Sequence, residues 1–78
     1  MNEIRYVCRF RSGATGEIRD IPVSLEPHEL EDVERHRKEG HGCGSVHGPL
    51  ARRFAWDHAL RMVPPEFAPI YEQARLVN

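Results

Sequence analysis

The first part of the chain alternates hydrophobic and polar residues with a period of two. The apolar residues of one parity are Ile4, Tyr6, Cys8 and Phe10. This pattern is typical of a β-strand with one buried face. A turn-forming segment with two glycines follows, so residues 3–23 predict a β-hairpin. Ile18 and Ile21 have opposite parity, which predicts a bulge or a weaker register in the second strand. Pro22 predicts that this strand ends or lies at an edge.

Two helices are predicted in the middle of the chain. The first, at about residues 27–39, begins with a proline, has its acids early and its bases late, and is followed by a glycine. Glu29 stands three residues after Glu26, where the acid of a capping box belongs. The second helix, at about residues 49–63, ends before two prolines. It carries a line of small residues that favours close packing on a sheet: Ala51, Ala55 and Ala59.

The last segment, residues 66–77, fits two kinds of structure. Its apolar residues fit one face of a helix, although Pro69 would lie inside that helix, and they also alternate like a strand. A lone hairpin is marginally stable and gains from a third strand, so we favour the strand. Residues 1–78 are therefore predicted to form one small α+β domain of order β-β-α-α-β, an antiparallel hairpin plus a third C-terminal strand packed by two helices.

Length and composition exclude several classes of function. A chain of 78 residues builds one small core, which leaves little room for an enclosed enzyme pocket. We therefore expect no catalytic activity. The net charge of −1 argues against a mainly electrostatic grip on nucleic acid. The first residues lack the apolar run of a signal peptide and no stretch approaches 18 apolar residues, so we expect a cytoplasmic protein without a membrane partner.

The loop at residues 40–48 concentrates groups with metal-ligand chemistry. It holds four of the six glycines, two of the five histidines and one of the two cysteines. Imidazole and thiolate are the ligands of zinc, and the candidate set is His36, His41, Cys43 and His47. Their spacing matches no common zinc module and lacks Cys-x2-Cys pairs, so a solvated glycine connector without a cofactor is favoured. A zinc-stabilised domain is kept as an alternative.

A basic face is predicted on the hairpin. It would consist of Arg5, Arg9, Arg11 and Arg19. Such a face could follow a nucleic-acid backbone, which makes a nucleic-acid-binding module another alternative. Aromatic residues for base stacking are not interleaved with it, because Tyr6 and Phe10 have the opposite parity. Arginines on a solvated sheet face are the simpler interpretation.

Segregated charge favours a charged protein partner. Residues 24–39 carry six acids against three bases, whereas arginines predominate elsewhere. The predicted partner-binding residues are Glu29, Glu31, Asp32, Glu34, Arg52 and Trp56. The sequence thus predicts a non-enzymatic protein-binding module. Size and class alone suggest a phage or mobile-element inhibitor of host machinery, for example of a CRISPR effector complex. Monomer and homodimer, the latter extending the sheet at Pro22 or at the tail, both remain open.

Overall fold

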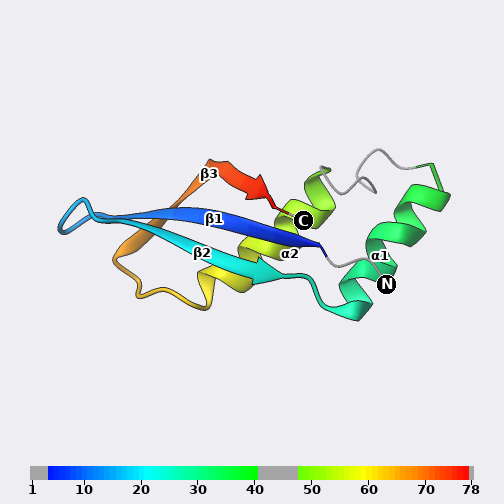
Figure 1. Cartoon of the computed structure of the whole chain (residues 1–78), viewed down its shortest axis with the longest axis horizontal. Helices are drawn as coiled ribbons and strands as arrows, with labels where there is room; N and C mark the ends of the chain where they lie inside the picture. The colour runs from blue at the N-terminus through cyan, green and yellow to red at the C-terminus, as the bar shows by residue number, and fades with distance from the viewer. Residues whose placement is uncertain (1–3, 41–47, 78) are drawn as a thin grey trace.

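The predicted fold class and element order are confirmed. The computed structural model describes residues 4–40 and 48–77, and it has three strands and two helices in the order β-β-α-α-β (Figure 1). The elements are β1 (Arg5–Ser12), β2 (Ile18–Ser24), α1 (Pro27–Lys38), α2 (Pro49–Leu60) and β3 (Phe67–Leu76). The C-terminal segment is therefore a strand, and the helical alternative for it is wrong. The predicted loop at 40–48 lies mostly outside the described residues.

The three strands form one antiparallel sheet in the order β2-β1-β3. β2 is thus an edge strand, as Pro22 predicts. The register of β1 with β2 is unbroken from Arg5 opposite Ser24 to Arg11 opposite Ile18, so the predicted bulge in β2 is wrong. The irregularity lies in β3 instead, where residues 70–73 all stand opposite the single position of Arg9.

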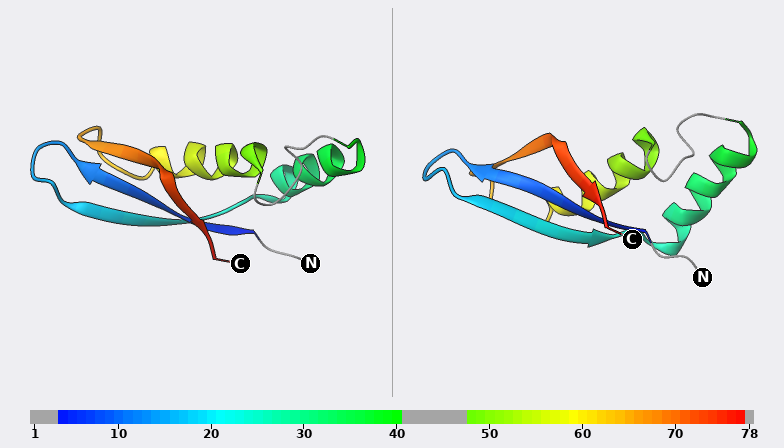
Figure 2. Two further views of the ribbon diagram at one scale, coloured as in Figure 1. Left: turned by 90° about the horizontal axis from the view of Figure 1, so that it is seen from above. Right: turned by 45° about the horizontal axis from the view of Figure 1, so that its top comes forward.

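One face of the sheet is covered by α2 (Figure 2). The core lies between them, because the apolar parity of β1 points toward the helix and Tyr6, Cys8 and Phe10 are its largest fully buried side chains. The alanine line of α2 is fully buried against this layer, as its spacing predicts. In the described part of the chain no helix covers the opposite face, which we call the open face.

The helix α1 lies beyond the end of the sheet and packs against α2 rather than against the strands (Figures 1 and 2). Its one buried apolar side chain is Val33. The molecule measures 44 × 22 × 19 Å and has a radius of gyration of 13.3 Å, whereas a compact chain of this length would have about 11.5 Å. The elongation leaves α1 attached through a small contact area.

Both helices end slightly earlier than predicted. α1 ends at Lys38, and Gly40 follows with a φ of +81°, the left-handed conformation that glycine adopts at helix ends. α2 ends at Leu60 instead of residue 63, and its last carbonyl groups accept hydrogen bonds from the N–H groups of Arg61 and Met62. Neither helix of the described residues is long and apolar enough to cross a membrane.

Candidate functional site

A groove of about 590 Å³ runs along the outer side of α2 beside β3, and it is open to solvent. It combines two arginines, two aromatic residues and one exposed leucine with one carboxylate. The lining residues are Pro49, Arg52, Arg53, Trp56, Asp57, Leu60 and Tyr71. The structure thus brings together Arg52 and Trp56, two of the residues predicted to bind a partner. We call this surface the α2–β3 groove.

Three aromatic rings connect the core to the floor of the α2–β3 groove. Phe10 is fully buried, and its ring packs edge-to-face on Trp56 with 5.4 Å between the centroids. Trp56, 6% exposed, packs edge-to-face on Tyr71 with 5.0 Å between the centroids. Tyr71 itself is 55% exposed. An exposed tyrosine ring is therefore held in place by a buried scaffold, which lowers the entropy that it loses when a partner binds.

The bulge of β3 places Tyr71 in the groove. Arg9 Nη1 donates a hydrogen bond of 3.0 Å to Gln73 Oε1 in the bulge, while the rest of its guanidinium bonds to Asp20 on β2. On the helix side, Arg52 Nη2 donates to the Tyr71 carbonyl oxygen at 3.3 Å. The bulge is thus fastened from both faces of the sheet. Bulges commonly change the direction of a side chain in this way. Regular alternation along β3 would not predict the position of Tyr71.

The two arginines of the groove carry charge that the described chain does not neutralise by ion pairing. Four other arginines do pair with a carboxylate of this chain: Arg9, Arg19, Arg35 and Arg37. Among the described residues, Arg52 and Arg53 have no such ion pair, and Asp57 is the one carboxylate that lines the groove. The groove therefore offers two guanidinium groups to an external anion.

Glu29, one of the residues predicted to contact a partner, presents little surface to solvent. Glu29 is only 7% exposed. Its Oε1 accepts the backbone N–H of Glu26 at 2.7 Å, the acid's half of a capping box, and lies 2.8 Å from Nε2 of His58 on α2. The first contact satisfies a free donor at the start of α1, and the second joins the two helices. Glu29 is a structural residue.

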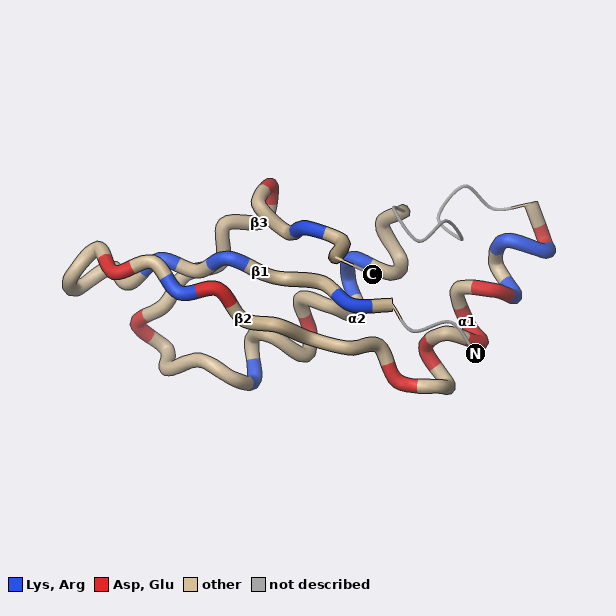
Figure 3. Tube along the Cα trace, viewed as in Figure 1, with Lys and Arg blue, Asp and Glu red and all other residues tan. Residues whose placement is uncertain are grey.

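The other predicted acidic contacts lie on α1, where basic residues also occur along the helix (Figure 3). Asp32 pairs with Arg35 at 2.6 Å, and Glu34 pairs with Arg37. The hydrogen bond from Arg37 lowers the pKa of Glu34 below its usual value. Glu31 is exposed. Because basic residues one turn later offset two of the acids, α1 presents mixed charge to solvent.

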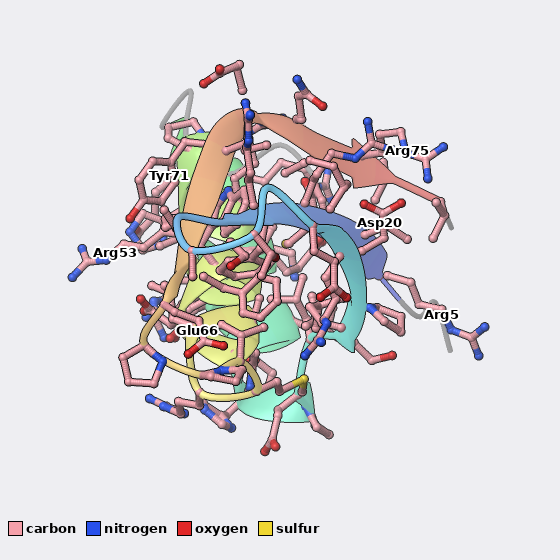
Figure 4. The ribbon with its side chains drawn as sticks, turned by 90° about the vertical axis from the view of Figure 1, so that its left-hand side faces the viewer. Arg5, Asp20, Arg53, Glu66, Tyr71 and Arg75 are labelled. Carbon is pink, nitrogen blue, oxygen red and sulfur yellow. The ribbon has the colours of Figure 1, made fainter. Side chains whose placement is uncertain are left out.

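The basic face predicted on the hairpin exists in part. Arg5, Arg9 and Arg11 lie on the open face, and Arg75 of β3 joins them through its register opposite Val7. Sequence reasoning missed Arg75 because only the pairing of β3 shows which face it occupies. Figure 4 shows Arg5 and Arg75 on the side of the molecule opposite to Arg53 and Tyr71.

Arg19 does not belong to that basic face. It stands opposite Phe10 and therefore on the side of the sheet that α2 covers, where its guanidinium lies 4.3 Å above the ring of Phe67. The charge of Arg9 is also partly offset, because its hydrogen bonds to Asp20 lower the pKa of that carboxyl group. The open face thus holds four arginines against Asp20.

The zinc candidates are not brought together by the described residues. His41, Cys43 and His47 lie outside them, and His36 places Nδ1 2.8 Å from the Asp32 carbonyl oxygen. Within residues 4–40 and 48–77 no group of three or more histidine, cysteine, aspartate or glutamate side chains could hold a metal ion. Zinc binding by the loop stays a prediction.

The free thiol of Cys8 has no catalytic environment. It is fully buried in the core, and burial raises its pKa to about 11 although the charge of Arg52 acts in the opposite direction. A thiol with so high a pKa is a poor nucleophile at neutral pH.

The free edge of β2 is blunted by a proline. Ser12 and Glu17 form a hydrogen-bonded pair at the hairpin end, with the Ser12 N–H donating at 2.8 Å. Hydrogen-bonded and non-hydrogen-bonded pairs alternate along antiparallel strands, and Pro22 opposite Val7 is a non-hydrogen-bonded pair. The backbone groups of Pro22 therefore point away from β1. At that outward position the proline supplies no N–H donor.

The free edge of β3 is blunted in the same way. The Gly13 N–H donates to the Glu66 carbonyl oxygen at 3.0 Å, which fixes the alternation in this half of the ladder. Pro69, opposite Phe10, therefore also occupies an outward position. The bulge at residues 70–73 interrupts the rest of the edge. Both edges are thus poor templates for an added strand, which disfavours a homodimer built by extending the sheet.

Comparison with protein-family models, with curated proteins and with solved structures finds no match to this chain.

Proposed function

We propose that this protein is a non-enzymatic protein-binding module and that the α2–β3 groove is its contact surface. The observation that carries the proposal is the arrangement of Tyr71 on buried Trp56 with Arg52 beside them. Tryptophan, tyrosine and arginine dominate the binding energy of protein interfaces, above all where they are fixed before binding.

The surroundings of the groove support this proposal. Leu60 is 42% exposed at one end of it, and Met62 follows just beyond α2 with 55% exposed. A partner would gain by covering these apolar side chains. Since prolines blunt both edges of the sheet, a partner has a better docking surface on a face of the molecule than along its edges.

The proposal is tested by capturing partners with matched variants. The wild-type protein, Tyr71→Ala and Arg75→Ala are immobilised, and proteins bound from a lysate of the host are quantified by mass spectrometry. Tyr71 and Arg75 belong to the same strand but lie on opposite sides of the molecule (Figure 4). We expect specific proteins that are lost with Tyr71→Ala and retained by Arg75→Ala. Equal capture by all three proteins, or no captured protein at all, would contradict the proposal.

Nucleic-acid binding is the second candidate function, and one observation favours it. Arg75 adds a fourth arginine to the open face formed by Arg5, Arg9 and Arg11. Affinity for a single-stranded oligonucleotide should then fall steeply with salt, and Arg75→Ala should reduce the slope of log K against log salt by about 1. A flat salt dependence would exclude this candidate.

Two finer parts of the hypothesis stay predictions: the inhibition of host machinery by a phage or mobile-element protein, and the cytoplasmic location. The identity of the proteins captured through Tyr71 would decide the first of them, because a host nucleic-acid-processing complex is the expected target.

A further inference from the structure

We propose that the α2–β3 groove selects a peptide segment with a carboxylate side chain at one end and an aliphatic or aromatic side chain at the other. The inference rests on the proposed protein-binding function and names the chemistry of the partner. The carboxylate would bind at Arg52 and Arg53, and the apolar side chain would pack between Leu60 and the ring of Tyr71.

Charge and apolar surface are separated along the groove. Arg52 and Arg53 lie in the first half of α2, whereas Leu60 is its last residue. Seven or eight helical residues correspond to about 11 Å along the helix axis. An extended peptide covers that distance in about three or four residues. The spacing therefore specifies an acidic residue and an apolar residue about three or four positions apart.

The cationic end is prepared for a carboxylate. Neither Arg52 nor Arg53 makes an ion pair with a carboxylate of the described chain, so a partner does not need to displace an internal one. Arg52 is also held in position by its hydrogen bond to the Tyr71 carbonyl oxygen. A fixed guanidinium loses little side-chain entropy when it binds a carboxylate. The first turn of α2 carries no acid, so the positive end of the helix dipole adds to the same attraction.

The apolar end is prepared for a hydrophobic side chain. Leu60 and Tyr71 are both partly exposed, and the floor between them is formed by Trp56, which is anchored on Phe10. An aliphatic side chain placed there would remove apolar surface from water on both partners. Asp57 lies on α2 between the two ends, so its charge disfavours a second acid in the middle of the segment. The groove therefore distinguishes peptides by the position of their acidic residue as well as by their charge.

A polyanion fits the groove less well. Single-stranded nucleic acid also combines negative charge with rings that stack on aromatic residues. Its phosphates recur at every nucleotide, however, and a continuous row of them would meet Asp57 and the apolar Leu60 as well as the two arginines. A protein segment with one localised charge avoids both conflicts.

The first experiment is a peptide-display selection on the immobilised full-length protein, with a random ten-residue library. Binders are counter-selected on Tyr71→Ala so that only peptides that need the groove remain. We expect enrichment of Asp or Glu three or four positions from Leu, Ile or Phe. Enrichment of neutral or basic peptides would overturn the inference and leave the protein-binding proposal standing. No enrichment would overturn it too, and the lysate capture then decides separately whether the groove binds a folded partner.

The second experiment is a charge exchange with the best enriched peptide. Its affinity is measured by calorimetry for the wild-type protein, for Arg53→Glu and for Arg75→Glu, which makes the same change of net charge on the opposite side of the molecule. We expect Arg53→Glu to weaken binding about tenfold or more, Arg75→Glu to change it little, and a lysine in place of the peptide's acid to restore binding to Arg53→Glu. Equal losses in both variants, or no rescue, would overturn the inference.

Nucleic acid enters as a competitor in the same assay. A single-stranded thymidine oligonucleotide is titrated against the peptide complex. We expect no displacement at concentrations near the Kd of the peptide. Displacement that is lost in both Tyr71→Ala and Arg53→Glu would show that the groove prefers a polyanion, and this would overturn the inference in favour of nucleic acid. Circular dichroism of each variant confirms that the fold is retained.

Discussion

Replacing Glu29 with alanine tests whether one buried carboxylate holds α1 on the molecule. Its Oε1 accepts the Glu26 N–H at 2.7 Å and lies 2.8 Å from His58 Nε2. In Glu29→Ala the first turn of α1 loses its capping partner, and the imidazole of His58, only partly exposed, loses its partner at Nε2. Both losses act at the small contact between α1 and α2.

The expected cost follows from these two contacts. Loss of a helix cap costs about 1 kcal/mol, and a partly buried hydrogen-bonding group left without its partner costs about 1–2 kcal/mol. Together they make about 2–3 kcal/mol, against a total stability of about 4–12 kcal/mol for a chain of this length. Since 1 kcal/mol shifts the melting temperature of such a domain by about 4–8 °C, Glu29→Ala should lower it by about 8–24 °C.

Thermal unfolding followed by circular dichroism measures this effect, with Glu31→Ala as the control. Glu31 is an exposed acid on the same helix, so its replacement should change the melting temperature by no more than a few degrees. A double-mutant cycle with His58→Ala isolates the contact between the helices, and we expect a coupling energy above about 0.5 kcal/mol. Equal effects of Glu29→Ala and Glu31→Ala, or additivity in the cycle, would refute the reasoning.

Three further predictions concern the sheet. Burial and a pKa of about 11 should protect Cys8 from iodoacetamide at pH 8 in the folded protein but not in urea, as peptide mapping would show. Arg9 lowers the pKa of Asp20, so their ion pair stabilises the fold above the ordinary carboxyl pKa and is lost as the pH falls through the lowered one. NMR titration of Arg9→Ala should move that pKa back up, and an unchanged value would contradict the assignment. Replacing Pro22 and Pro69 with valine should restore outward N–H donors and increase self-association in sedimentation experiments; unchanged sedimentation would contradict the assigned role of these prolines.

The order of elements could be predicted because each element has a local signal. The alternation in β1 and the line of alanines in α2 specify which faces are buried, and both predictions are confirmed. The bulge was predicted in the wrong strand for a physical reason. Ile18 stands opposite Arg11 on the open face and is exposed there, whereas Ile21 stands opposite Cys8 on the covered face. Their opposite parity thus comes from an exposed residue in an edge strand with regular register. Alternation cannot tell an interrupted register from an exposed apolar residue.

The candidate site could be predicted only in part, because its geometry depends on contacts between distant segments. Arg52 and Trp56 were found because they lie on one helix, where spacing determines the face. The exposed position of Tyr71 beside them depends on a bulge in β3, which the sequence does not reveal. Glu29 carried a correct local signal as a capping acid, and this signal contradicted its use as an exposed contact.

The acids of α1 and the arginines of the groove show that local charge in the sequence is a poor guide to charge that a partner can use. A buried group is withdrawn from partners, and the charge of a paired group is partly offset by its neighbour. Glu34 is paired with Arg37 and Glu29 is buried, so a segment with a net charge of −3 offers fewer accessible acids than its sequence suggests. Arg52 and Arg53 belong to a segment of smaller net charge, yet the described chain pairs neither of them with a carboxylate. For this reason the groove, and not the acidic helix, is the surface on which electrostatic recognition of a partner should depend.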